Sequence, residues 1–161
     1  MGSKEQRNIV VQIAKHFKNI DFSTLKLKML IKTICNRFKV SKATISIAIV
    51  DDAWFRKLNK KFLNHNGTSD CLSFDLSDDK KQQSPRLFEL IINGQKTVKE
   101  AKLRGHSSEA ELALYVTHGL LHNIGFDDST QKQSKKMHKT EDQILQQFGF
   151  GPVYSKNAKA E

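Results

Sequence analysis

Two histidines followed by a glycine and two aspartates are the residues of this sequence best suited to hold a metal ion. His118 and His122 lie four apart in THGLLHNIGFDD, so on a helix both imidazoles project from one face and can bind one ion. Gly125 can adopt the left-handed conformation that ends a helix and turns the chain back, which brings Asp128 towards the imidazoles. Paired histidines also occur by chance on packed helix faces. The order H-x-x-x-H-x-x-G-x-x-D is what favours a metal site.

The ligand types predict a catalytic site and not a structural one. Three protein ligands, His118, His122 and Asp128, leave the fourth position of a tetrahedral zinc ion for water. The two histidines would then act in catalysis through the metal-bound water, whose pKa the ion lowers. Asp127 competes with Asp128 for the third position, because adjacent carboxylates in a turn can each approach an ion or cap the next helix. The spacing after Gly125 favours Asp128.

The residue directly after His118 limits the kind of hydrolysis that the site can catalyse. The spacing matches that of the metzincin proteases, but Gly119 stands where those enzymes carry the glutamate that acts as general base. Peptide hydrolysis by that mechanism is therefore disfavoured. Two histidines and one carboxylate also form the facial triad that holds Fe(II) for oxygen chemistry, and the ligand types alone fit either metal.

The expected ligands need a helix and a turn to position them. Ser108 and Glu111 have the S-x-x-E spacing of a capping box, so a helix is expected from about Glu109 to Ile124, where Gly125 ends it. A further helix is expected from about Thr130 to Phe148.

Strands and helices alternate before this point. In ATISIAIV, over 43–50, isoleucine occupies every second position, which is the period of a strand with one buried face. Other strands are expected at 8–14, CLSFDL and LFELIIN, the last two as a hairpin, and other helices after Ser23, after Asp51 and Asp52, and over 96–103. The pattern indicates an α+β fold with a small mixed four-stranded sheet flanked by helices. With 161 residues, one domain over 1–161 is expected.

Charge and composition favour a polyanionic partner. The chain has 27 Lys+Arg against 17 Asp+Glu, a net charge of +10, which is typical of RNA-binding proteins, although it can serve solubility alone. The segment after Asp52 carries four cations with aromatic residues between them: Arg56, Lys57, Lys60 and Lys61. The cations could contact phosphates while the aromatic residues stack on bases, or the segment could be an ordinary solvated helix face. Only two cysteines and no long apolar run indicate a soluble, cytoplasmic protein that does not enter a membrane.

HGLLHNIGFDD resembles the HGxLHLxGYDH motif of the YbeY family, metal-dependent endoribonucleases in which three histidines hold the metal. LNKKFLNHNGTSDCLSFDL and FELII resemble two further family segments, so the resemblance covers about residues 45 to 145. It implies a small mixed sheet with a zincin-like metal helix and one divalent ion, most often zinc. It also implies single-strand-specific cleavage of RNA in 16S ribosomal RNA 3' end maturation and ribosome quality control.

The sequence departs from the family pattern at the third ligand and at a substrate contact. Asp128 replaces the third histidine, which lowers the net charge of a bound ion and makes its water a weaker acid. Leu63 falls where many members carry an arginine that contacts the substrate, and Lys60, Lys61 or His65 could replace it. Asn123 and Phe88 replace a leucine and a glycine.

The resemblance also implies residues that shape the site: Ser69, Asp70, Ser73 and Glu89. A serine or aspartate after a turn is also an ordinary cap at the start of a strand. The alternative function is a non-catalytic ribosome- or RNA-binding factor in which the metal only stabilises the fold. Asp128 and Leu63 keep this alternative open.

Overall fold

The computed structural model describes residues 8–63, 71–79, 84–151 and 153–154, without the side chains of 62 and 63. The elements follow one another as β1 (Asn8–Lys15), α1 (Thr24–Arg37), β2 (Lys42–Val50), α2 (Asp52–Leu63), β3 (Cys71–Asp75), β4 (Arg86–Asn93), α3 (Gly94–Arg104), α4 (Ser108–Ile124) and α5 (Gln131–Gln147). These elements lie where the periodicity of the sequence predicts them, within a few residues at each end.

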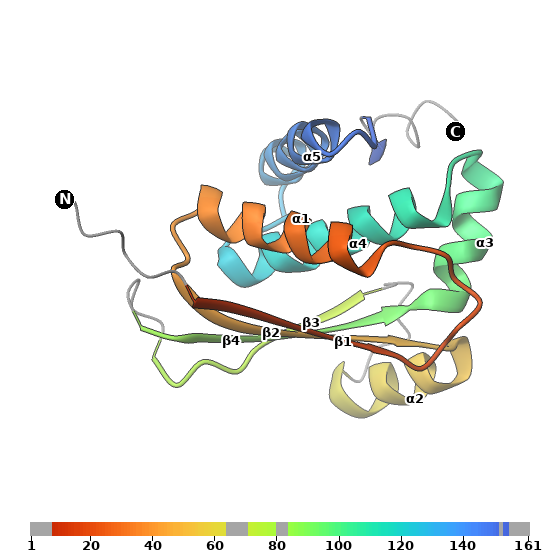
Figure 1. Cartoon of the computed structure of the whole chain (residues 1–161), viewed down its shortest axis with the longest axis horizontal. Coiled ribbons are helices and arrows are strands. Elements are labelled where there is room, and N and C mark those ends of the chain that lie inside the picture. Colours follow the sequence, from red (N-terminus) through yellow and green to blue (C-terminus); the bar gives the residue numbers. More distant parts are fainter. Residues whose placement is uncertain (1–7, 64–70, 80–83, 152, 155–161) are drawn as a thin grey trace.

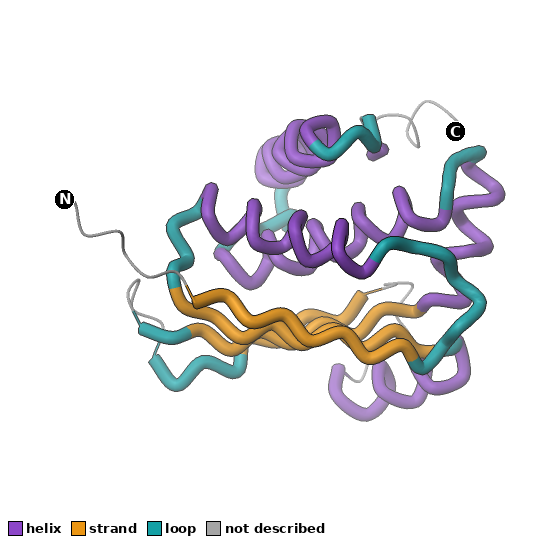
Figure 2. The backbone as a smooth tube through the Cα atoms, in the orientation of Figure 1, coloured by secondary structure: helices purple, strands orange, loops and turns teal. Residues whose placement is uncertain are grey.

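The strands form one mixed sheet in the order β1-β2-β4-β3. β1, β2 and β4 run parallel to one another, and β3 pairs antiparallel with β4 as the expected hairpin. The tube in Figure 2 shows these strands as a single twisted layer. The α+β fold with a four-stranded mixed sheet is thus confirmed.

Helices cover both faces of the sheet unequally. In Figure 1, α1 and α4 lie over one face with α5 beyond them, whereas α2 lies on the opposite face. Side-chain alternation along β4 explains both layers: Phe88, Leu90 and Ile92 belong to the large core under α1 and α4, and Ile91 packs with Phe55 of α2. Each such fully buried side chain contributes about 1.5–3 kcal/mol to stability. None of the described helices combines the length and apolarity that a membrane span requires.

The buried face of α2 differs from the expected one. Apolar residues recur every four positions in the sequence of this helix, at Trp54, Leu58 and Phe62, but Trp54 is 43% exposed and its ring packs against His16. Phe55 and Asn59 are the buried pair, and Leu58 packs against the same small core as Phe55. The side chain of Phe62 lies outside the described residues, so the apolar stripe expected from the spacing fails at Trp54, because i, i+3 and i, i+4 spacings fit several adjacent stripes of a short helix.

The start of α4 also differs from the prediction. The side chain of Ser107 accepts a hydrogen bond from the amide of Ala110 and caps the helix. The capping box of Ser108 and Glu111 does not form, because Glu111 turns inward, is fully buried and binds His106. Glu111, in the first turn of the helix, therefore stabilises the protein interior and does not cap the helix.

Gly119 allows α4 to lie close to the sheet. A β-carbon at this position would meet the Cys71 sulfur and a Leu90 methyl at 2.9 Å each, closer than carbon atoms normally approach. The glycine that argued against a protease base thus has a packing role. It brings the histidine-bearing helix onto β3 and β4.

Candidate metal centre

The last turns of α4 and the loop after it bring His118, His122 and Asp128 together. The Nε2 atoms of the two histidines lie 3.1 Å apart, and Asp128 Oδ2 lies 3.6 Å from each of them. Gly125 ends the helix at φ +122°, as its position predicted, and the chain then turns back. The three potential ligand atoms therefore converge on one point.

Both imidazoles are oriented by a hydrogen bond at the nitrogen that faces away from this point. His118 Nδ1 lies 2.5 Å from a Glu141 carboxylate oxygen, and His122 Nδ1 lies 3.1 Å from the carbonyl oxygen of Phe126. An ionised carboxylate and a carbonyl can only accept, so both Nδ1 atoms carry the proton. In the neutral imidazoles, two bare Nε2 lone pairs then face each other, an arrangement that needs a cation or a shared proton between them.

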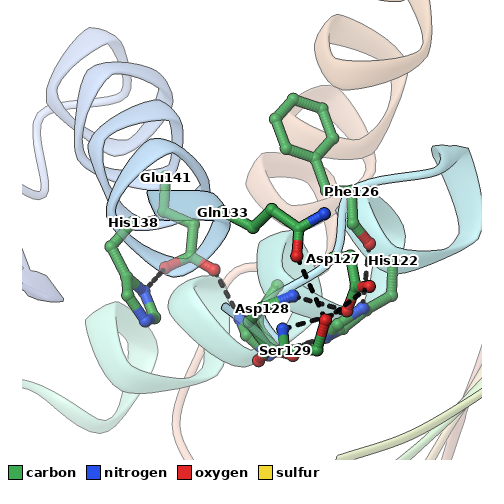
Figure 3. Close-up of polar contacts among 9 residues, drawn as sticks. His122, Phe126, Asp127, Asp128, Ser129, Gln133, His138 and Glu141 are labelled. Carbon is green, nitrogen blue, oxygen red and sulfur yellow. Dashed lines mark hydrogen bonds and ion pairs between the residues drawn. The ribbon is translucent and has the colours of Figure 1, made fainter. Parts of the chain in front are cut away.

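Glu141 anchors the histidine side of the centre from α5. It is fully buried, and its second oxygen binds His138 Nδ1 at 2.7 Å, as Figure 3 shows. Burial alone would raise the pKa of Glu141, but the hydrogen bonds from His118 and His138 outweigh it and hold the pKa below its ordinary value. The His138 ring stacks on Tyr154 at 3.5 Å between centroids. The His138 ring is therefore half-buried, with Glu141 and Tyr154 in contact with it.

Asp127 and Asp128 play different parts in the turn. The Asp127 carboxylate accepts from the backbone amides of Asp128 and Ser129 and from the Ser129 hydroxyl, a cluster visible in Figure 3. The hydroxyl bond from Ser129 is the main cause that lowers the Asp127 pKa. Asp127 thus stabilises the loop, and the Asp128 carboxylate is directed to the imidazoles.

A polar cleft opens beside the three ligands, and its other wall comes from the β-hairpin. Ser73 on β3 donates to Asn123 Oδ1 at 2.9 Å, and Arg86 on β4 donates to Asp75 at 2.7 Å. These four residues line the same cleft as His118, His122 and Asp128. The half-buried Cys71 lines it as well, whereas Cys35 is fully buried in the core.

The family model described as Endoribonuclease YbeY matches residues 12–149 of this chain. The chain belongs to the YbeY family.

Relatives and a solved structure agree with this membership. Proteins named Endoribonuclease YbeY are 32% identical over 137 residues in Caldicellulosiruptor bescii, covering 76% of this chain and 87% of the relative, and 31% identical over 148 residues in Myxococcus xanthus. The latter alignment covers 91% of this chain but only 50% of the Myxococcus protein. The solution structure of TM1509 from Thermotoga maritima has the same fold, with a TM-score of 0.58 at 19% identity over 86% of this chain and 89% of that one.

Possible RNA contacts and site-shaping residues were also predicted from the sequence, and the structure gathers few of them at the centre. The cations of α2 lie across the sheet from α4 (Figure 1), where Arg56 pairs with Asp52 and three lysines are exposed: Lys57, Lys60 and Lys61. Ser73 reaches the cleft. Glu89 is half-buried and lies on the α2 side of β4, since Phe88 and Leu90 face the other way. His65, Ser69 and Asp70 lie outside the described residues.

Sequence reasoning missed Glu141, although a signal was present. Along α5 the buried positions recur at helical spacing: Met137, Thr140, Glu141, Ile144 and Leu145. A glutamate within an otherwise core-facing row needs a partner, since carboxylates are almost never fully buried without one. The two histidines that it binds were the available partners.

Proposed function

We propose that this chain is a metal-dependent endoribonuclease that cleaves single-stranded RNA at the centre formed by His118, His122 and Asp128. The observation that carries the proposal is the convergence of two imidazole nitrogens and one carboxylate oxygen beside an open cleft. The names of the YbeY relatives support the reaction, and the net charge of +10 supports a polyanionic substrate.

We assign one divalent ion, zinc, to these three residues, because two nitrogens and one oxygen suit zinc and leave a further position for substrate. When bound there, the ion polarises a phosphodiester and lowers the pKa of a water, which is the chemistry that RNA hydrolysis needs. Glu141 holds His118 in the tautomer whose Nε2 is bare, and the Phe126 carbonyl does the same for His122. Asp128 adds a negative charge and is 40% exposed, so the ligand set is open on the cleft side.

Family membership further favours ribosomal RNA as the substrate, in 16S ribosomal RNA 3' end maturation and ribosome quality control. The cations on α2 then serve as a docking surface remote from the metal centre, because α2 lies across the sheet from α4.

Elemental analysis paired with cleavage of a structured RNA tests the proposal. Wild type is expected to hold about one zinc ion per chain and to cut unpaired segments. His118→Ala and Asp128→Ala should lose both the metal and the cleavage. Asp127→Ala is the matched control: it removes the neighbouring carboxylate, which binds Ser129 in the turn, and should retain the metal.

Two outcomes would replace the proposal. If wild type binds RNA but never cuts it, and His118→Ala binds equally well, the chain is a metal-stabilised RNA-binding factor. If Asp128→Ala retains metal and Asp127→Ala loses it, the third ligand is Asp127.

A further inference from the structure

Asn123 leaves a polar atom without a partner beside the metal centre. The residue is only 8% exposed, and its Oδ1 accepts from Ser73, but Nδ2 is buried and has no hydrogen-bond partner within the described residues. An unsatisfied buried amide costs about 1–3 kcal/mol, and an apolar side chain of similar size would avoid that cost. The amide is thus a feature that folding alone does not explain.

The position of Asn123 points to the cleft as the place where a partner would enter. Asn123 directly follows the ligand His122 and lines the cleft from the α4 side. Ser73 and Asp75 line it from β3, where residues two apart share one face of the sheet. The orphaned amide therefore belongs to a continuous polar wall that faces the substrate side of the metal centre.

The charge of this wall argues against a phosphate site. Among the described residues that line the cleft, Arg86 is the one arginine or lysine, and it pairs with Asp75 at 2.7 Å, with both side chains largely buried at 16% and 17% exposure. The pair has no net charge, and it places the guanidinium N–H donors of Arg86 next to the carboxylate acceptors of Asp75. A phosphate would meet the carboxylate of Asp75 as well as the guanidinium, whereas the edge of a nucleobase carries both acceptors and donors.

We infer that the wall formed by Ser73, Asp75, Arg86 and Asn123 binds the base edge of one unpaired nucleotide next to the bond that is cut. The Asn123 amide donates to a carbonyl or ring nitrogen of that base, and the Asp75–Arg86 pair contacts the rest of its edge. Single-stranded RNA exposes these edges, which is how most sequence-specific RNA recognition operates. The inference rests on the proposed function for the position of the cut and adds a nucleotide preference to it.

Sequencing the ends produced from a random single-stranded RNA tests this wall. Wild type should favour one or two nucleotides at a fixed position next to the cut. Asn123→Leu removes the amide at similar volume and should reduce that preference about tenfold, the effect of losing roughly 1.4 kcal/mol of discrimination. Metal content should be unchanged.

Thr117→Val is the matched control. Thr117 is also buried on α4, and its hydroxyl has no hydrogen-bond partner among the residues that the structure describes. It is not one of the residues that line the cleft, so its replacement should leave the preference intact. Ser73→Ala is a second variant, which removes the hydrogen bond that orients Asn123 and should weaken the preference in the same direction.

The remaining outcomes separate this inference from the proposed function. A wild type that cuts without nucleotide preference, or an Asn123→Leu protein with unchanged preference, overturns the inference and leaves the nuclease intact. If Asn123→Leu reduces cleavage equally at all RNA sequences, the inference is overturned too, because the amide would then act on the RNA backbone that all sequences share. If wild type does not cut, the affinities of short A, C, G and U homopolymers decide. If the wild-type affinities differ between the homopolymers and Asn123→Leu abolishes these differences, the wall binds bases although the nuclease proposal fails. Equal wild-type affinities for the homopolymers overturn the inference as well.

Discussion

A buried glutamate binds a histidine near each end of α4, with different consequences. At the start of the helix, Glu111 binds His106 Nε2 at 2.6 Å and the Tyr115 hydroxyl at 2.7 Å. Near its end, Glu141 reaches across from α5 and binds His118 and His138. Both carboxylates are fully buried, and each binds a histidine ring.

The difference lies in the second nitrogen of the histidine. His106 Nδ1 is buried, has no hydrogen-bond partner in the described part of the chain, and belongs to none of the groups of potential metal ligands found there. His118 Nε2 instead faces His122 and Asp128 at the cleft. The same pairing thus stabilises the fold at one end of the helix and orients a ligand at the other, and only access to the cleft separates the two roles.

The largest effect is expected at the closed cluster. Glu111→Ala should lower the free energy of unfolding by about 3 kcal/mol, because it leaves the largely buried His106 ring and the Tyr115 hydroxyl without the buried carboxylate that they bind. Chemical denaturation measures this. Glu100→Ala removes the more exposed of the two carboxylates that pair with Arg104, the other being Glu111, and should cost less than about 1 kcal/mol. Equal losses in the two variants would show that Glu111 is no more than a surface partner.

The open cluster should respond in metal affinity. Glu141→Gln keeps the size of the side chain but removes the charge that orients His118, and zinc affinity should fall about 10- to 100-fold. Competition with a chromogenic chelator at neutral pH measures the affinity. Glu111→Gln is the counterpart at the other end of α4 and should bind zinc like wild type. A loss of affinity in both variants would mean that the two clusters are not independent.

The sequence predicted the open cluster better than the closed one, for a physical reason. His118, His122, Gly125 and Asp128 lie within eleven residues, so helical spacing and one turn suffice to place them. Glu141 comes from another helix, and its contact depends on how α5 packs on α4, which local periodicity does not encode. The same holds for the hairpin wall of the cleft, where pairing of β3 with β4 brings Asp75 to Arg86.

The sequence also did not predict which face of the sheet α2 covers. The pattern of α2 predicted a cationic amphipathic helix, and the helix is present, but whether it lies with α4 or across the sheet is decided by chain crossover. The α+β class and the element order follow from periods of two and 3.6, whereas the placement of α2 depends on tertiary packing.

Gly119 lets α4 lie close to β3 and β4 one residue after His118, and its replacement tests how tightly the open cluster is held. Gly119→Ala should destabilise the protein by about 1–3 kcal/mol through contact with Cys71 and Leu90. Alanine is otherwise favoured in a helix by up to about 1 kcal/mol, so any loss reports the steric clash. Thermal and chemical unfolding measure it, and Gly119→Ala combined with Cys71→Ala should recover part of the loss. A more stable Gly119→Ala protein would mean that the helix does not need this close approach.

The smallest effect concerns the Asp75–Arg86 pair, which resembles the closed cluster in its pairing and the open one in its position. Burial tends to raise the Asp75 pKa, but the bonds from Ser77 and Arg86 outweigh it, so the folded-state pKa lies below the ordinary value of 3.8. A carboxyl whose pKa is lower in the folded state contributes stability above its unfolded pKa and loses it as the pH falls through the folded value. Wild type should therefore be more stable than Asp75→Asn at neutral pH, and the difference should shrink as the pH falls below about 3.8. Denaturation curves at pH 7, 5, 4 and 3 measure it, with Asp79→Asn as an exposed control. If the difference in stability between wild type and Asp75→Asn does not change with pH, Asp75 stabilises the wall of the cleft through hydrogen bonding alone and not through its charge.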